Sequence, residues 1–190
     1  MAQVLKDSVR NSIYSSAVNE MYKNGYKDAT MKKIAGGAGI PAGLIYSYFK
    51  NKAELFHEIV RPVVSALQNM NSEELTDDPE KNLYEIELPI WLNCIERYNR
   101  QMVILIDKSS GSGFESFKED CISEVTKHLR STPGLRETDF DIVFYHILAT
   151  NFMEGIFEIA RHYKDRKWAD DMLRLLIKQH RFGTASLSSS

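Results

Sequence analysis

Residues 30–56 read TMKKIAGGAGIPAGLIYSYFKNKAELF, and this stretch decides the fold. Two short helices joined by a tight turn need a small residue where they meet, a glycine four positions later, and a branched apolar anchor beyond it. Ala35, Gly39 and Ile45 stand at those places, and Ile34 and Ile40 complete a small core. The spacing therefore predicts a helix-turn-helix whose second helix is held at an angle that fits a major groove.

The residues on either side of this stretch predict further helices. Apolar residues from position 9 to position 22 recur at helical spacing, and Gly25 stands where a left-handed C-terminal cap is expected. Thr30 is placed to cap the next helix. At Asn51 we expect a capping box in which Asn51 caps forward and Glu54 reaches back to the Asn51 amide. Pro62 predicts a kink or a break in the helix that follows.

The middle of the chain also has helical spacing. Asp78 as a cap and Pro79 at the first helical position begin a stretch that runs toward residue 107, with a second kink or break at Pro89. The apolar run 102–106 could be a buried strand, but the helical spacing of its neighbours favours a helix. Ser112 with Glu115 should open the next helix, and residues 132–134, Thr-Pro-Gly, should close it.

Two regular helices are expected near the C-terminus. Thr138 and Asp141 form a predicted capping pair ahead of a helix that is apolar on more than one face, and Trp168 begins the pattern of a final helix. The fold class is therefore all-α. We expect a three-helix DNA-binding domain over residues 1–50, a second helical domain over 51–183, and a small polar tail over 184–190 that is disordered.

The charge is distributed unevenly along the chain. The 190 residues carry a formal net charge of −2, with 43% hydrophobic and 26% charged residues, which is ordinary for a globular protein. Residues 1–52 contain eight Lys and Arg against three Asp and Glu, a net charge of +5, so the remainder carries −7. A basic segment on an acidic body is typical of a polyanion-binding head, with a chance fluctuation as the alternative.

Several classes of protein are disfavoured by what the sequence lacks. No stretch approaches the roughly 20 continuous apolar residues of a membrane helix, and residues 1–10 lack the apolar core of a signal peptide, so we expect a cytoplasmic protein without a membrane partner. Cys94 and Cys121 form no metal knuckle and no disulfide framework, and two reduced, buried thiols are expected. We assign no metal, no cofactor and no catalytic residue.

The stretch 30–56 resembles the N-terminal signature of the TetR family, and the rest of the chain is similar in helix count, length and two apolar C-terminal helices. The resemblance implies a ligand-responsive transcriptional repressor that binds a palindromic operator in double-stranded DNA. It further implies a homodimer formed through the last two helices, with recognition helices about 34 Å apart. The domain over 51–183 would then bind the ligand and dimerise, and Gly155 would allow close approach in the bundle.

The resemblance also implies a set of DNA contacts. Thr30 would bind a phosphate at a helix N-terminus, with a plain helix cap as the alternative role. Tyr46, Tyr48 and Lys52 would contact phosphates, although Tyr48 is equally compatible with an inward core position. The complete predicted set comprises Thr30, Lys32, Pro41, Ala42, Gly43, Leu44, Tyr46, Ser47, Tyr48 and Lys52.

Two features depart from the family pattern. Where the family often has a polar run, residues 41–44 are Pro-Ala-Gly-Leu and offer no side chain that pairs with a base edge. We expect Ala42 and Leu44 to touch thymine methyl groups, with further specificity from DNA shape and half-site spacing. Gly36 and Gly37 cost about 2 kcal/mol relative to two alanines in a helix interior. This cost reflects either drift tolerated with close packing or a head that becomes ordered only on DNA.

A ligand pocket and two rival functions complete the expectations. An apolar or aromatic effector would be lined by Trp91, Tyr98, Met102, Phe117, Phe144 and Phe152, for which a simple core position is the alternative. Glu54 and His57 have the Glu-x-x-His spacing of a helical-bundle metalloenzyme, but the other four histidines lack a glutamate three positions earlier. The other rival is a TetR-like interaction module that does not bind DNA.

Overall fold

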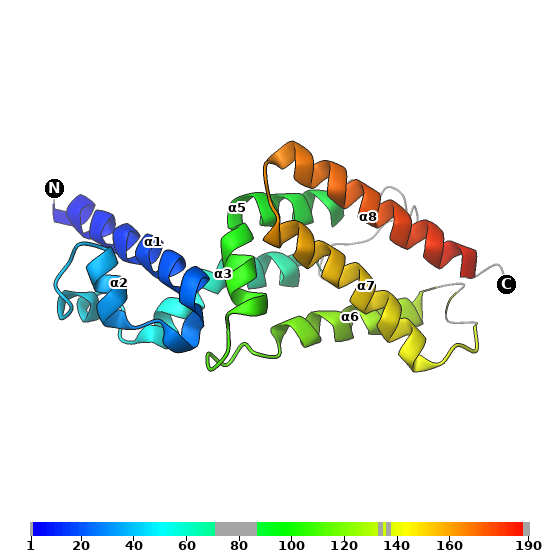
Figure 1. The fold of residues 1–190 in the computed structure, drawn as a ribbon, viewed down its shortest axis with the longest axis horizontal. Coiled ribbons are helices and arrows are strands. Elements are labelled where there is room, and N and C mark those ends of the chain that lie inside the picture. Colours follow the sequence, from blue (N-terminus) through cyan, green and yellow to red (C-terminus); the bar gives the residue numbers. More distant parts are fainter. Residues whose placement is uncertain (1, 71–86, 133–134, 136–137, 188–190) are drawn as a thin grey trace. The chain divides into compact units, whose positions relative to one another are not determined.

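The computed structural model describes residues 2–70, 87–132, 135 and 138–187 (Figure 1). All regular elements within these residues are helical, which confirms the all-α class. The elements are α1 (Ala2–Asp28), α2 (Met31–Gly37), the 3₁₀ helix η1 (Leu44–Ser47), α3 (Lys52–Met70), α5 (Leu88–Asp107), α6 (Phe117–Ser131), α7 (Ile142–Arg161) and α8 (Arg166–Leu187).

The chain forms two compact units. The first unit contains Met1–Gln68 and Arg100–Glu115, and the second contains Asn69–Asn99 and Ser116–Ser190. The predicted functional boundary after residue 50 stays a prediction, and within the first unit α3 shares an aromatic cluster with the head. The Phe56 ring lies 4.9 Å from the Tyr26 ring and 5.8 Å from the Phe114 ring. The first unit therefore extends well beyond the predicted three-helix domain.

In the first unit, α1 is held by the C-terminal part of α5 and the residue that follows it. The expected interruption occurs at Gly25, whose φ is 77°. The Tyr26 amide, next to it, donates to the Lys108 carbonyl over 2.8 Å. Arg100 donates to the Asn19 amide oxygen over 2.7 Å, and its guanidinium lies 4.6 Å from the centre of the Tyr22 ring. The end of α1 is thus fixed at both the backbone and the side-chain level.

The start of α3 confirms one half of the predicted capping box. The Glu54 amide donates to the Asn51 side-chain oxygen over 2.8 Å. The Glu54 carboxylate reaches back to the Lys50 amide over 2.6 Å, one residue before the predicted Asn51 amide. Helix α3 continues through Pro62, so this proline does not end the helix, although it removes one bond of the helical ladder and clashes locally.

The course of α5 confirms the helical interpretation of residues 102–106. The start of the stretch cannot be compared, since Asp78 and Pro79 lie outside the described residues. Pro89 is the second residue of α5, a first-turn position that needs no amide donor, and the predicted kink or break there also involves residues outside the described ones. The interruption within α5 occurs at Tyr98, with φ −136° and ψ 24°, which no breaker residue in the sequence indicated.

The starts of two helices in the second unit differ from expectation. Helix α6 begins at Phe117 after Ser116, because Ser112 accepts the Phe114 amide in a local turn instead of capping the helix. Helix α7 begins at Ile142, and Asp141 alone caps it by accepting the Val143 amide over 2.8 Å, in place of the predicted pair of Thr138 with Asp141. Thr138 is not part of that cap, since its hydroxyl donates to the Leu135 carbonyl.

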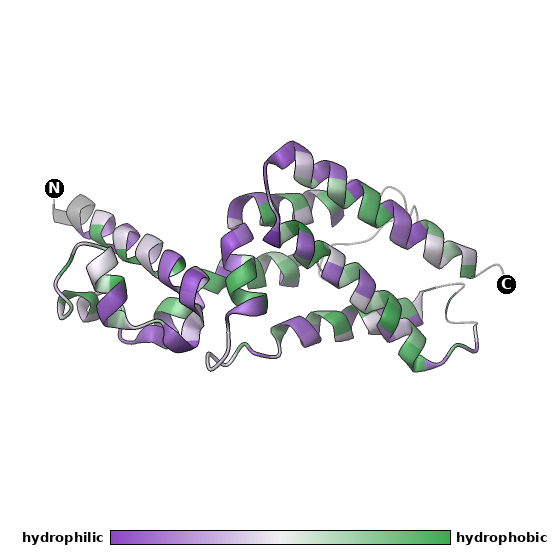
Figure 2. Cartoon of the chain, in the orientation of Figure 1, coloured by the Kyte–Doolittle hydropathy of each residue, from purple (hydrophilic) through white to green (hydrophobic). Residues whose placement is uncertain are grey.

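The last helix is longer than expected. Helix α8 continues to Leu187, so residues 184–187 of the predicted disordered tail are helical, and the Thr184 hydroxyl donates to the His180 carbonyl one turn earlier. Hydrophilic and hydrophobic residues alternate along α8 in the pattern of an amphipathic helix (Figure 2). Its buried side is formed by Ala169, Leu173 and Ile177.

Helix α7 provides much of the core of the second unit. Its buried residues are Tyr145, Ala149, Met153, Ile156, Phe157, Ile159 and Ala160. A Cβ added at Gly155 would lie 2.6 Å from Leu176 Cδ1, so this glycine permits close approach of α7 and α8 within one chain. Across the described residues, α7 is the one helix whose length and apolarity would allow it to cross a bilayer, a test that core helices also pass.

Candidate DNA interface

The start of α2 has the geometry of a capped helix. Thr30 is extended, with φ −126° and ψ 148°, and its hydroxyl oxygen accepts the Lys33 amide over 3.2 Å. The predicted cap is therefore confirmed. The Thr30 and Lys32 side chains are both exposed at this end of the helix, where first-turn amides have no intrahelical acceptor. The structure places these two predicted DNA contacts together.

The turn after α2 has the conformation that the spacing predicts. Gly39 has φ +70°, a region that side chains with a Cβ rarely adopt, and the Ile40 amide donates to the Ala35 carbonyl over 3.0 Å. Ile34, Ala35 and Ile45 are fully buried. The glycine bend and its small core thus hold η1 against α2, which confirms the helix-turn-helix.

The second helix of the motif is shorter than predicted. It forms one 3₁₀ turn over Leu44–Ser47, and Gly43 at its start supplies no side-chain cap. Ile45 points into the core, whereas Leu44 is 40% exposed and Tyr46 is 57% exposed. Pro41, Ala42, Gly43 and Ser47 are exposed as well. The turn therefore presents an outward surface on which apolar atoms and one phenol predominate.

Tyr48 and Lys52 lie differently from the other predicted contacts. Tyr48 is half-buried, between the outward and inward positions considered for it. The Lys52 ammonium donates to three carbonyl oxygens, those of Tyr26 at 2.6 Å, Lys27 at 3.2 Å and Ala29 at 3.0 Å. Because an ammonium has three N–H groups, this arrangement engages all of them. In this structure Lys52 therefore contacts the backbone, and its predicted phosphate contact stays a prediction.

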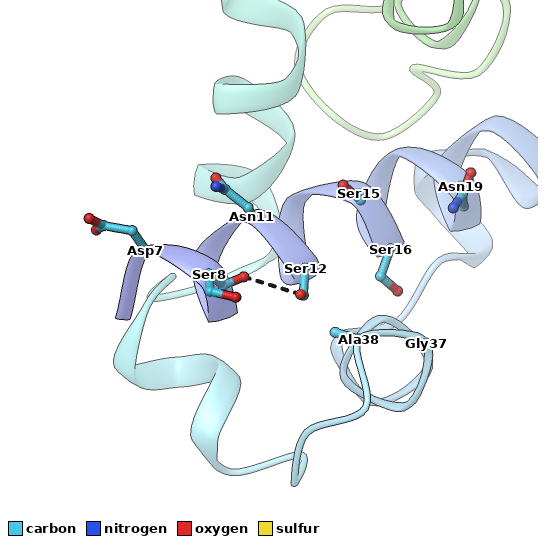
Figure 3. A pocket seen from close by; sticks show the side chains of 9 residues that line it. All are labelled: Asp7, Ser8, Asn11, Ser12, Ser15, Ser16, Asn19, Gly37 and Ala38. Carbon is cyan, nitrogen blue, oxygen red and sulfur yellow. Dashed lines mark hydrogen bonds between the residues drawn. The ribbon is translucent and has the colours of Figure 1, made fainter. Parts of the chain in front are cut away.

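The two glycines of α2 have different surroundings. The Ser16 hydroxyl donates to the Ile34 carbonyl over 2.7 Å, and a Cβ added at Gly37 would lie 2.4 Å from that hydroxyl. Figure 3 shows the Ser16 side chain pointing from α1 toward the turn that carries Gly37. A Cβ at Gly36 would meet nothing within 4 Å. Close packing therefore accounts for Gly37 but not for Gly36.

A polar groove runs beside this contact and was not anticipated. Its lining residues come from one face of α1 and from the end of α2, namely Asp7, Ser8, Asn11, Ser12, Ser15, Ser16, Asn19, Gly37 and Ala38 (Figure 3). The sequence signal was available, since serines and asparagines recur along α1 at steps of three and four. The face opposite the apolar side of α1 is thus uncharged for most of its length.

Part of the positive charge of the head is already paired within the first unit. Arg10 forms an ion pair with Glu58 and lies over the Phe49 ring at 4.6 Å. Lys33 lies 3.5 Å from a Glu20 carboxylate oxygen. Lys52 also has partners within the chain. A polyanion would therefore meet fewer unpaired cationic groups than the sequence count of eight suggests.

The six predicted effector residues occupy mixed environments. Trp91 and Met102 are buried, and the other four are partly exposed. The Phe144 ring lies 5.2 Å from the Phe140 ring, and the Phe152 ring stacks on the His180 ring at 4.4 Å. Met102 belongs to the first unit and the remaining five to the second. The pocket itself stays a prediction.

Glu54 and His57, which were considered as a rival metal-binding pair, make other contacts in the structure. The Glu54 carboxylate accepts the Lys50 amide, and the His57 ring lies 5.8 Å from the Phe114 ring. No group of three or more His, Cys, Asp or Glu side chains in the described part of the chain is placed to hold a metal ion. The Glu-x-x-His spacing is explained by helix capping and packing.

Comparison with known proteins agrees with this geometry. Residues 13–59 match the family model described as bacterial regulatory proteins, tetR family. A curated HTH-type transcriptional regulator of Haemophilus influenzae, itself uncharacterised, is 29% identical over 116 residues, which are 61% of each chain. A probable acrEF/envCD operon repressor of Escherichia coli is 32% identical over 108 residues, 55% of this chain and 47% of the relative. The chain thus spans about half to three fifths of these relatives.

Solved structures extend the likeness in fold over nearly the whole chain. A TetR-family regulator from Bordetella parapertussis has a TM-score of 0.69 at 16% identity and covers 90% of this chain and 93% of its own. NalD, the secondary repressor of an efflux pump in Pseudomonas aeruginosa, has a TM-score of 0.59 at 20% identity, with coverage of 91% and 95%. With the helix-turn-helix built as described and matched at its own residues, the chain carries over residues 13–59 the N-terminal domain of the tetR family of bacterial regulatory proteins, on a fold that it shares with solved TetR-family regulators.

Proposed function

We propose that this regulator is a ligand-responsive repressor that binds a palindromic operator as a homodimer. The observation that carries the proposal is the outward surface of η1, where Leu44 and Tyr46 are exposed while Ile45 anchors the turn in the core. The Escherichia coli relative is named as a probable operon repressor, which supports the direction of regulation. A repressor acts by binding, so no catalytic residue is assigned, and its site of action is the cytoplasm.

The DNA contacts divide into positioning and reading groups. Thr30, Lys32, Tyr46 and Ser47 would bind phosphate oxygens, which fix the register of the head on the duplex. Ala42 and Leu44 would meet thymine methyl groups in the major groove, since residues 41–44 have no side chain that pairs with a base edge. Sequence preference would come mainly from thymines, DNA shape and half-site spacing.

The homodimer would use α7 and α8. Both helices carry large apolar side chains on their exposed side, including Val143 at 58% and Leu175 at 61% exposure. Ile142, Ile147 and Phe182 are exposed in the same way. A second copy would cover these groups in an isologous bundle and would place two recognition helices about 34 Å apart.

The effector would be a small apolar or aromatic molecule held in the second unit. Its proposed lining consists of Trp91, Tyr98, Phe117, Phe144 and Phe152. Met102 is a buried core residue, four positions after the interruption of α5 at Tyr98. Such a ligand can release DNA only if it binds the released form more tightly than the DNA-bound form. Its chemical identity can be sought by screening small molecules for a shift in the melting temperature of the protein.

The proposal is tested by measuring operator affinity as a function of salt. Binding to a promoter fragment should weaken as the salt concentration is raised from 50 to 200 mM. Tyr46→Phe removes one hydroxyl and should weaken binding by a factor of roughly 2–10, the value of one hydrogen bond. Tyr163→Phe, in the second unit, is the matched control and should leave affinity unchanged. An absence of salt-dependent binding would favour the interaction-module alternative, and a selected site rich in guanine would refute the thymine reading.

A further inference from the structure

We propose that Lys52 is a positioning residue that ties the junction between α1 and α2 to the start of α3. This inference rests on the proposed DNA-binding function, because the junction leads directly into Thr30 and the DNA-facing end of α2. Lys52 would therefore control DNA affinity through the geometry of that end, and not as a phosphate ligand.

The contacts of Lys52 converge on one short segment. Its ammonium donates to the carbonyls of Tyr26, Lys27 and Ala29 at 2.6, 3.2 and 3.0 Å. The same nitrogen lies 4.3 Å from the centre of the Tyr26 ring, a cation–π distance. Lys52 thus spans more than 20 residues of sequence to hold a four-residue segment by four contacts.

The chemistry of the segment explains why a cation is held there. The last carbonyls of a helix have no intrahelical donor and carry the negative end of the helix dipole. A compact ammonium with three rotatable donors can satisfy several of them at once, which a planar guanidinium does less well. The half-buried position of Lys52 strengthens these bonds relative to bonds in open water.

The segment is also fixed from its other sides, so Lys52 completes a rigid support. The Tyr26 ring packs edge-on against Phe56 at 4.9 Å, and the Tyr26 amide donates to the Lys108 carbonyl over 2.8 Å. The Ala29 amide donates to the Gly25 carbonyl over 3.1 Å. Ala29 directly precedes Thr30, whose hydroxyl caps α2. Loss of the Lys52 contacts would therefore release the cap from α3.

The experiment compares Lys52→Met, Lys52→Arg and Lys23→Met in the full chain. Lys23 is exposed on α1 and serves as the control for loss of one positive charge in the head. Two quantities are measured: hydrogen exchange of the Lys33 amide, which the Thr30 hydroxyl accepts, and the dependence of operator affinity on salt. The first needs no DNA, so it tests the positioning role even if the proposed function fails.

We expect Lys52→Met to lower the protection of the Lys33 amide and the operator affinity by about tenfold or more, since bonds to a charged group are being lost. The slope of log affinity against log salt should stay as in the wild type, because no phosphate contact is removed. Lys52→Arg keeps the charge yet should also lose protection and affinity. If Lys52→Met fails to fold, Lys52→Arg alone tests the positioning role of Lys52. Lys23→Met should leave the protection of the Lys33 amide unchanged.

Two outcomes would overturn the proposal. One is a salt slope reduced by about one in Lys52→Met with normal protection of the Lys33 amide, which is the result expected of a phosphate ligand. The other is wild-type protection and affinity in Lys52→Arg, which would show that charge alone matters. A wild-type protein that binds no DNA would instead contradict the proposed function, and the exchange measurement would still decide the role of Lys52.

Discussion

Replacing Gly36 with alanine should stabilise the first unit, whereas replacing its neighbour Gly37 should destabilise it. Both residues lie at the end of α2, so an alanine at either position raises helix propensity. Their surroundings differ, because a Cβ at Gly36 meets nothing within 4 Å and a Cβ at Gly37 meets the Ser16 hydroxyl at 2.4 Å. Comparing the two variants therefore tests whether close packing limits the residue at position 37 and not the residue at position 36.

The magnitudes follow from these contacts. Gly36→Ala should gain about 0.5–1 kcal/mol, the cost of glycine in a helix. Gly37→Ala gains the same amount but must displace the Ser16 hydroxyl, whose bond to the Ile34 carbonyl measures 2.7 Å. Overpacking costs about 1–3 kcal/mol, and a lost hydrogen bond about 0.5–1.5 kcal/mol. The net effect should be a destabilisation of about 1–3 kcal/mol.

Urea unfolding of the full chain, followed by circular dichroism, would measure both changes as shifts in the midpoint. The double variant Ser16→Ala/Gly37→Ala should recover much of the loss, because removal of the hydroxyl makes room for the methyl group, and a double-mutant cycle isolates that coupling. If both single variants stabilise alike, the steric argument fails and a head that becomes ordered only on DNA becomes the better explanation of the two glycines.

Three further predictions follow. Burial raises the pKa of Cys94 to about 12, and burial with the carboxylates of Asp120 and Glu124 raises that of the half-buried Cys121 to about 12, so both thiols should react slowly with Ellman's reagent at pH 8 until the protein is unfolded in urea; rapid labelling of the folded chain would contradict this. Burial, and then Arg181 and His128, lower the pKa of His180, so its neutral form is favoured in the folded state. The stability that it contributes should be present above pH 6.5 and lost as the pH falls through the folded pKa, and His180→Phe should flatten the urea midpoint between pH 7.5 and 5. Val143→Glu or Leu175→Glu should convert a dimer into monomers in sedimentation velocity, whereas Lys127→Glu, on α6, should not.

The features that the sequence predicted well depend on residues close together in the chain. The caps at Thr30 and Asn51 each require an acceptor within three positions of its donor, and the structure contains both. The glycine bend at Gly39 follows from the same local logic. The helix-turn-helix was therefore readable without any knowledge of tertiary contacts.

The features that the sequence did not predict depend on distant contacts or on competition between local ones. In the sequence, Lys52 stands where a phosphate contact is expected. Only the folded chain shows that the end of α1 and Ala29 supply acceptors for its ammonium. Gly155 was expected to allow close approach in the helical bundle, but only the folded chain shows that Leu176 is the residue beside it. Ser112 lost the role of helix cap because a nearer turn engaged its hydroxyl. The interruption at Tyr98 has no local signal at all.

The internal pairing of Arg10, Lys33 and Lys52 has a consequence for how operator occupancy responds to the ionic environment. Each phosphate neutralised by a protein cation releases condensed counterions, and the entropy of that release makes binding sensitive to salt. Since three cations of the head are already committed, fewer counterions would be displaced than its lysines and arginines suggest. The proposed repressor would then stay bound to DNA at salt concentrations that dissociate a more highly charged regulator.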